Sequence, residues 1–337
     1  MTAWLEDLGF STKTYKRELL GDHTLYETPK VENLTKILLL GHNDTVFPEN
    51  YFEDFIEDDT WVYGPGVCDM KGGNIVALES LRNIHKKNGS IKNIDFLLVS
   101  DEESGSDDSK LVTASLAKNY DYCFVFEAAG ENLEVVTGRK GVGTYTIHIE
   151  GKASHAGTSY LKGIDANLEA SYKLQKLVAL TNVEIGTTVN VGKITGGIGA
   201  NTISPKCEMI IEIRFNQNSE KQRLLNSLNE IVNTSYVEGT KTTLTGGIQR
   251  DVMEANSSQK ELISLLENIT ALKISTEQRG GVSDANIVAA CGVTTLDGFG
   301  PYGDGDHTIK ERALKSSFEQ RIKMMTDILS YFQNQTK

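Results

Sequence analysis

The chain has 337 residues, of which 39% are hydrophobic and 24% charged, and its formal net charge is −12. This length is more than one ordinary core requires and favours two domains. The acidic balance, without any basic run, argues against nucleic-acid binding, because that function needs Lys and Arg to displace the counterions condensed on phosphates.

The sequence also bears on the compartment. No apolar run approaches the roughly 20 residues that a membrane span needs, and the acidic N-terminus lacks the basic-then-apolar order of a signal peptide. The four cysteines are widely separated, which favours reduced core residues over a disulfide framework or a Cys-ligated zinc site. We therefore expect a cytoplasmic protein without a membrane or nucleic-acid partner.

The first part of the chain alternates between short apolar strands and helices. A short helix over residues 4–8 is closed by Gly9. Short, largely apolar runs then predict buried strands over residues 37–40, 94–99 and 123–126, and residues 72–87 have helical spacing. Buried strands that alternate with helices are typical of βαβ units with a mostly parallel sheet.

The middle of the chain has a different period. Tyr145, Ile147 and Ile149 alternate with polar residues, which predicts a half-exposed strand over residues 143–150. Further strands are expected over residues 188–194 and 208–215, and helices over residues 166–180 and 224–232. The order β-α-β-β-α-β favours a ferredoxin-like antiparallel domain.

The last part returns to the first pattern, with helices expected over residues 262–272, 284–290 and 316–332 and a strand over residues 293–296. We therefore predict an α/β domain with a mixed, mostly parallel sheet flanked by helices, formed by residues 1–138 and 248–337. Residues 139–247 form an inserted α+β domain.

Side chains suited to metal binding follow the predicted strands of the first domain. In open parallel sheets ligands bind outside the carboxyl ends of the strands, and crowded carboxylates raise each other's pKa unless a cation neutralises them. A glycine-rich segment over residues 64–73 adds Asp69 before a helix. The strand-end residues are His42 and Asp44 after the first strand, Asp101, Glu102 and Glu103 after the second, and Glu127 after the third.

Each motif alone has an ordinary explanation. His42 and Asp44 could form a surface pair, residues 101–108 a solvated acidic loop, and residues 64–73 a plain turn. A phosphate-binding or nucleotide-binding protein is disfavoured because no Gly-Lys-Ser/Thr sequence follows the glycines. The combination at successive strand ends is more specific than any single motif.

With three further segments, the chain resembles the dinuclear zinc peptidase family of glutamate carboxypeptidase, acetylornithine deacetylase, succinyl-diaminopimelate desuccinylase and aminoacylase. Glutamate carboxypeptidase is the most similar branch, and the resemblance runs in order along nearly the whole chain. Family chains usually begin with an additional helix before the part that matches residues 4–9. The three segments are Gly-Lys-Ala-Ser-His-Ala-Gly over residues 151–157, Asn-Thr-Ile-Ser-Pro over residues 201–205, and Gly-Gly-Val-Ser-Asp-Ala over residues 280–285.

The resemblance implies two zinc ions per chain, with cobalt or manganese as alternatives. It implies that His42 and Glu103 bind one metal, that Glu127 and His307 complete the second site, and that Asp69 bridges both. Asp306 is the alternative ligand beside His307. Asp44 would orient His42, and the Asp69–Met70 peptide is expected to be cis.

The remaining roles are also implied by the resemblance. Glu102 resembles the general base, and His155 a histidine that stabilises the oxyanion across a dimer interface. The residues expected to bind the substrate carboxylate are Asn201, Arg214, Gly280, Gly281 and, more weakly, Arg279 and Lys140. An exposed loop histidine is the alternative for His155, and a surface salt bridge is the alternative for Arg214.

These roles predict a metal-dependent hydrolase that cleaves a peptide or N-acyl bond in a small carboxylate-bearing substrate and forms a homodimer through the inserted domain. An acetylornithine deacetylase-like or desuccinylase-like deacylase is the alternative within enzymes. A non-catalytic metal-binding relative is the alternative outside them.

Overall fold

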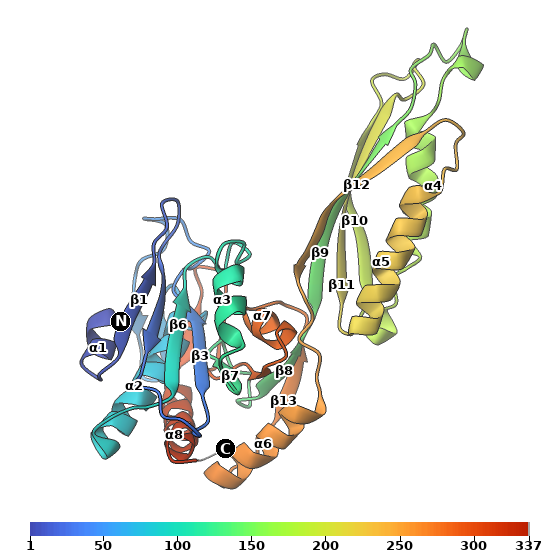
Figure 1. The fold of residues 1–337 in the computed structure, drawn as a ribbon. Helices are drawn as coiled ribbons and strands as arrows, with labels where there is room; N and C mark the ends of the chain where they lie inside the picture. The colour runs from blue at the N-terminus through green and yellow to red at the C-terminus, as the bar shows by residue number, and fades with distance from the viewer. Residues whose placement is uncertain (336–337) are drawn as a thin grey trace. The chain divides into compact units, whose positions relative to one another are not determined.

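The computed structural model describes residues 1–335, and the chain divides into two compact units (Figure 1). The first unit comprises Met1–Arg139 and Ala255–Lys337, and the inserted unit comprises Lys140–Glu254. The inserted unit ends later in the chain than residue 247, the end predicted from the sequence, because its last strand continues to Arg250.

A six-stranded, mostly parallel sheet forms the centre of the first unit, in the order β1-β2-β6-β3-β7-β14. Strand β3 lies between β6 and β7 and is parallel to both, whereas β1 and β2 add an antiparallel edge. Strands β3 and β6 are buried along their whole length, as their largely apolar sequences predicted, and β6 also buries Asp95. The strands are β1 (Ser11–Tyr15), β2 (His23–Glu27), β3 (Ile37–His42), β6 (Ile94–Val99), β7 (Tyr122–Val125) and β14 (Thr294–Leu296).

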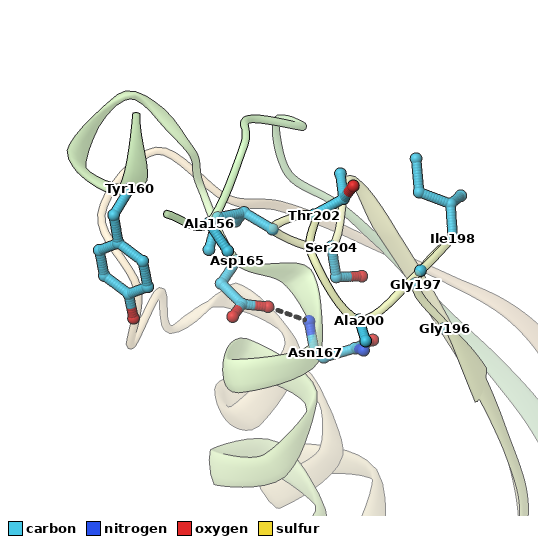
Figure 2. A pocket seen from close by; sticks show the side chains of 12 residues that line it. Ala156, Tyr160, Asp165, Asn167, Gly196, Gly197, Ile198, Ala200, Thr202 and Ser204 are labelled. Atoms are coloured by element: carbon cyan, nitrogen blue, oxygen red, sulfur yellow. Dashed lines mark hydrogen bonds between the residues drawn. The ribbon is translucent and has the colours of Figure 1, made fainter. Parts of the chain in front are cut away.

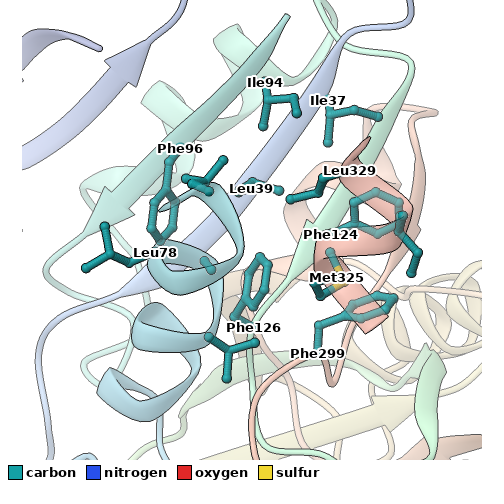
Figure 3. Close-up of a cluster of buried hydrophobic side chains, with 14 of the residues drawn as sticks. Ile37, Leu39, Leu78, Ile94, Phe96, Phe124, Phe126, Phe299, Met325 and Leu329 are labelled. Atoms are coloured by element: carbon teal, nitrogen blue, oxygen red, sulfur yellow. The ribbon is translucent and has the colours of Figure 1, made fainter. Parts of the chain in front are cut away.

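Helices pack on this sheet and enclose the main core. Figure 3 shows part of that core, where the rings of Phe124 and Phe299 meet edge to face with centroids 5.2 Å apart, near Met325 and Leu329. Burial of each such side chain contributes about 1.5–3 kcal/mol. The helices are α1 (Thr2–Glu6), α2 (Lys71–Asn88), α3 (Ser109–Ala117), α6 (Ser257–Thr270), α7 (Ala285–Ala290) and α8 (Lys315–Phe332). Within residues 1–335, none of the helices has the length and apolar character of a membrane span.

Helix α6 begins before the predicted residue 262. Its first turn is polar and carries no apolar period, but Asn256 and Gln259 form a reciprocal capping box in which the side chain of each accepts the backbone amide of the other. The cap signal, rather than hydrophobic spacing, therefore sets the start of this helix.

Two small sheets complete the first unit, and the sequence analysis did not predict them, because strands of two to five residues carry little readable period. One has the order β15-β16-β5-β4, and in the other β13 and β8 pair in parallel. The strands are β4 (Ile56–Glu57), β5 (Trp61–Tyr63), β8 (Val135–Arg139), β13 (Thr276–Arg279), β15 (Gly303–Asp304) and β16 (Arg312–Leu314).

The inserted unit has the predicted β-α-β-β-α-β order and an antiparallel sheet arranged β10-β11-β9-β12. Alternate residues such as Ile147 and Ile211 are buried in a second core with residues of both helices, including Leu177 and Leu228. Its elements are β9 (Gly141–Glu150), α4 (Ala166–Val178), β10 (Thr188–Gly196), β11 (Lys206–Phe215), α5 (Asn218–Asn233) and β12 (Lys241–Arg250), with short 3₁₀ turns at Tyr160–Lys162 and Val183–Ile185.

Candidate metal centre

The central sheet brings the predicted ligands to one edge. Strand β3 ends at His42, Glu127 follows β7 closely, and Glu103 lies in the loop after β6. Because these three strands are parallel neighbours, their carboxyl ends meet. Asp69 comes from the segment between β5 and α2, and His307 from the loop between β15 and β16.

Helix α2 approaches these strand ends very closely. A Cβ atom at Gly41 would lie 2.1 Å from Asn74 Oδ1, and one at Gly73 would lie 1.8 Å from the carbonyl oxygen of Phe126. The Asn74 amide donates a hydrogen bond of 2.6 Å to the carbonyl oxygen of His42. The two glycines thus permit a helix-to-strand contact directly beside the ligands.

The five predicted ligands form two groups that share Asp69, and within each group the ligand atoms lie within 4.8 Å of one another. In the inner group, His42 Nε2 lies 3.1 Å from Asp69 Oδ1 and 3.8 Å from Glu127 Oε1. In the outer group, His307 Nε2 lies 3.1 Å from Glu103 Oε2 and 3.4 Å from Asp69 Oδ2. Asp69 therefore offers a different oxygen to each group, as a bridging carboxylate would.

This grouping corrects the pairing expected from the sequence. We expected His42 with Glu103, but His42 lies with Glu127, and Glu103 lies with His307. His42 and Glu127 both stand at the sheet edge, whereas Glu103 lies farther out along its loop, where it meets the hairpin that carries His307. The Asp69–Met70 peptide is cis, as predicted.

Asp44 lies beside the inner histidine. His42 Nδ1 lies 3.1 Å from the carbonyl oxygen of Asp44 and 3.4 Å from its Oδ1 atom, and Asp44 Oδ2 accepts the Glu103 amide at 3.0 Å. A proton on Nδ1 is donated to the carbonyl oxygen of Asp44, and loss of the proton on Nε2 would free the lone pair of that nitrogen for a cation beside Asp69 and Glu127. Such an outer partner fixes the tautomer of a ligating imidazole.

The charges of the two groups are not balanced. Burial and the neighbouring Asp69 raise the pKa of Glu103 to about 7 and raise that of Glu127 well above its ordinary value. Burial acts to raise the pKa of Asp69, but hydrogen bonds from His307 and His42 lower it. The hydrogen bond to Asp69 raises the pKa of His307 to about 9. Three carboxylates and two imidazoles at this spacing suit a divalent cation, which would relieve the repulsion.

Hydrogen bonds to two carboxylates fix the loop after β6. Asp101 Oδ2 accepts the amides of Asp108 and Ser109 at 2.9 and 3.1 Å, and the Ser106 hydroxyl donates to Asp284 Oδ1 at 2.5 Å. The sequence analysis counted Asp101 only among the strand-end carboxylates and gave Asp284 no role, since only the folded loop shows which groups they accept. Glu102 lies in this loop, and its charge acts to raise the pKa of both His42 and Glu127.

One neighbour of the groups has another partner. The carboxyl of Asp306 hydrogen-bonds with Cys68, and burial raises its pKa. Asp306 belongs to neither group of candidate ligands among the described residues.

Three predicted substrate residues of the first unit are Arg279, Gly280 and Gly281. Arg279 pairs with Glu277 at 2.6 Å and donates to the carbonyl oxygen of Ala128 at 3.0 Å. Gly280 and Gly281 are exposed, and a Cβ atom at either would meet nothing within 4 Å.

The other predicted substrate residues lie in the inserted unit. His155 is exposed, and its Nδ1 atom accepts the amides of Gly157 and Thr158 at 3.1 and 3.2 Å, which leaves the Nε2 proton available to donate. The Ala156 amide donates to the carbonyl oxygen of Asn201 at 2.9 Å, so His155 and Asn201 are near each other. Arg214 pairs with Glu212 at 2.8 Å, the surface salt bridge considered as its alternative.

A hollow of about 590 Å³ lies within the inserted unit (Figure 2). Ala200 and Thr202, which flank Asn201 in the chain, line it, and Asp165 caps helix α4 there by accepting the Asn167 amide at 2.9 Å. The candidate metal ligands all belong to the first unit, so this hollow is not the metal centre.

Comparisons with known proteins agree with this geometry. Residues 38–331 match the model of peptidase family M20/M25/M40. The chain is 27% identical to carboxypeptidase G2 of Pseudomonas sp. (strain RS-16), over 98% of this chain and 82% of that protein. It is 28% identical to acetylornithine deacetylase of Edwardsiella ictaluri, over 69% of this chain and 63% of that protein.

Among solved structures, the aminopeptidase PepT of Bacillus cereus superposes with a TM-score of 0.81 at 21% identity, over 98% of this chain and 91% of that chain. The family match covers most of the sequence and includes the sheet edge that carries the two ligand groups. The chain therefore belongs to peptidase family M20/M25/M40 and is a metal-dependent hydrolase of amide bonds.

Proposed function

We propose that this enzyme binds two divalent cations, zinc in the first instance, and releases an amino acid from a small peptide or N-acyl substrate that carries a carboxylate. The observation that carries the proposal is the pair of ligand groups that share Asp69, one oxygen to each. His42 and Glu127 would complete the inner site, and Glu103 and His307 the outer site. Cobalt and manganese accept the same nitrogen and oxygen ligands and are the alternatives.

The bound cations would lower the pKa of water toward 7 and polarise the substrate carbonyl. Glu102 is the proposed general base: it takes a proton from the attacking water as the carbon–oxygen bond forms. It then delivers that proton to the leaving nitrogen as the carbon–nitrogen bond breaks. Glu102 suits this role because it belongs to the same loop as Glu103 but to neither ligand group.

The other predicted residues would act on the substrate. His155 is the proposed donor to the oxyanion, and its Nδ1 acceptor bonds support this role because they leave an Nε2 proton to donate. Asn201, Arg214, Gly280 and Gly281 are proposed to bind the substrate carboxylate, with Arg279 as a weaker candidate. We further propose a homodimer through the inserted unit, and a cytoplasmic location, which the four free cysteines support.

A carboxypeptidase-like specificity is favoured over a deacylase-like one, because carboxypeptidase G2 matches nearly the whole chain and the deacetylase only about two thirds of it. Turnover by the zinc-loaded protein should therefore be fastest with dipeptides and N-acyl amino acids that end in glutamate. Acetylornithine, succinyl-diaminopimelate and tripeptides complete the panel, and Glu102→Ala is the blank. No turnover of any member above this blank would overturn the proposal in favour of a non-catalytic relative.

A further inference from the structure

The small four-stranded sheet joins the two segments that carry Asp69 and His307. Strands β5 and β16 are antiparallel, with Arg312 opposite Tyr63. The segment that leaves β5 and the segment that enters β16 therefore lie at the same end of this sheet. The first leads to Asp69, and the second contains His307 and ends at Glu311.

Glu311 links these two segments through its side chain. It is 1% exposed, and its Oε1 atom accepts the amides of Cys68 and Asp69 at 2.9 and 3.0 Å. Its Oε2 atom accepts the Gly66 amide at 2.9 Å. Both oxygens are thus engaged by backbone N–H groups, and Glu311 is in neither ligand group among the described residues.

The backbone of Glu311 joins the same segments. Its carbonyl oxygen accepts the Gly64 amide at 3.3 Å, and its own amide donates to the carbonyl oxygen of Thr308, directly after His307, at 3.1 Å. A shift of one segment against the other would change the 3.4 Å distance between His307 Nε2 and Asp69 Oδ2, on which the outer group depends.

We propose that Glu311 is a positioning residue that holds the Asp69 and His307 segments in register, so that the outer metal site exists before a cation arrives. This inference rests on the proposed function, because it presupposes that the two groups bind cations. Outer partners that orient metal ligands typically contribute 10–100-fold to metal affinity. Loss of the two carboxylate oxygens that accept the three amides should reduce zinc affinity by about this factor.

Two substitutions separate positioning from charge. Glu311→Ala removes both side-chain acceptors, whereas Glu311→Gln keeps one oxygen for the Cys68 and Asp69 amides and turns an NH₂ group toward the Gly66 amide. We expect zinc affinity in the order wild type, Glu311→Gln, Glu311→Ala. Equal losses in the two variants would indicate a charge effect and would overturn the positioning role.

Asp95→Asn is the matched control. Asp95 is fully buried at the start of β6, away from the ligand edge, and accepts the Thr28 amide at 2.9 Å and the Tyr120 hydroxyl at 2.6 Å. Its substitution should lower the thermal midpoint of the metal-free protein and leave zinc affinity unchanged. This control shows whether the loss of any buried carboxylate lowers zinc affinity, or only the loss of the carboxylate of Glu311.

The experiment measures zinc affinity and stoichiometry of the full metal-free chain by competition with a chromogenic chelator, with circular dichroism as the check of folding. If Glu311→Ala does not fold, Glu311→Asp takes its place, because it keeps the charge but is too short to reach all three amides; a zinc affinity below that of the wild type in this variant supports the inference. A folded variant of either kind with wild-type affinity overturns it. A wild-type chain that binds no zinc would instead overturn the metal centre itself.

Discussion

A buried ion pair of the inserted unit and the ligand cluster of the first unit handle charge in opposite ways. In the inserted unit, Lys173 and Glu169 are both fully buried and lie 3.0 Å apart. Lys173 Nζ also donates to the carbonyl oxygens of Ile231 and Thr234, each at 2.6 Å, and Glu169 accepts the amide of Val237 at 2.6 Å. One positive and one negative group thus satisfy each other and the end of helix α5.

The first unit instead gathers three carboxylates around two imidazoles, and burial together with the charge of Asp69 raises the pKa values of Glu103 and Glu127. In this cluster the two imidazoles do not offset the three carboxylates. A matched buried pair holds a fold together, whereas an unmatched cluster depends on a ligand for its neutralisation. The difference distinguishes a structural ion pair from a functional site, and four experiments test it.

The largest expected effect is on catalysis. Glu102→Ala should lower kcat by about 10²–10⁴-fold, because general base catalysis contributes that much. Zinc content, measured by elemental analysis, should stay at the wild-type value. Asp107→Ala, an exposed carboxylate of the same loop, should keep wild-type turnover. A Glu102→Ala variant with normal kcat would remove Glu102 from the mechanism.

The second test breaks the matched pair. Lys173→Met should lower the free energy of unfolding by about 3–5 kcal/mol, because it leaves Glu169 charged and buried without its partner. Denaturant titration measures this loss, and adding Glu169→Leu should recover much of it. An unchanged free energy of unfolding for Lys173→Met would show that the pair is not a structural element.

The third test applies a similar neutralisation to the unmatched cluster. Glu127→Gln should stabilise the metal-free protein by about 1 kcal/mol, because it relieves the repulsion by Asp69, and stabilising changes at strained functional sites are commonly of this size. The same variant should bind one zinc ion in place of two. Destabilisation of the metal-free form would mean that Glu127 supports the fold.

The smallest effect is on pH dependence. The folded-state pKa of His307 is about 9, above its ordinary value of 6.5, so its stabilising contribution is complete below pH 6.5 and is lost as the pH rises to about 9. Glu103 acts with the same sign between its ordinary value of 4.5 and about 7, since the folded state holds its proton longer.

The thermal midpoint of the metal-free protein should therefore fall as the pH rises from about 5 to 9. Zinc should oppose this trend, because ligands bind metal in their deprotonated forms. His307→Gln should flatten the upper half of the metal-free profile. A midpoint of the metal-free wild type that rises over this range would contradict the protonation states inferred here.

Much of the fold could be predicted from the sequence. Strands β3 and β6 were recognisable because burial on both faces requires continuous apolar residues, and the inserted unit because Tyr145, Ile147 and Ile149 alternate with polar residues. The carboxylates at strand ends also followed from the parallel sheet. These features depend on local sequence period, which a single chain displays directly.

The arrangement of the site could not be predicted to the same depth. The ligand grouping depends on how far each loop reaches, so Glu103 was expected beside His42 and lies beside His307. Strands β5 and β16 are too short to carry a period, and the link through Glu311 exists only because they pair. His307 itself has a φ of 62°, a backbone conformation that neighbouring residue types do not reveal.

The close approach of helix α2 at Gly41 and Gly73 has a consequence for sequence variation. Neither glycine has a side chain for chemistry, yet even a methyl group at either position would overlap Asn74 or the backbone of Phe126 and displace the strand ends. A saturation library scored for growth or turnover should therefore show two positions where size alone is selected. Their tolerance profile should resemble that of the ligands, although they touch neither cation nor substrate.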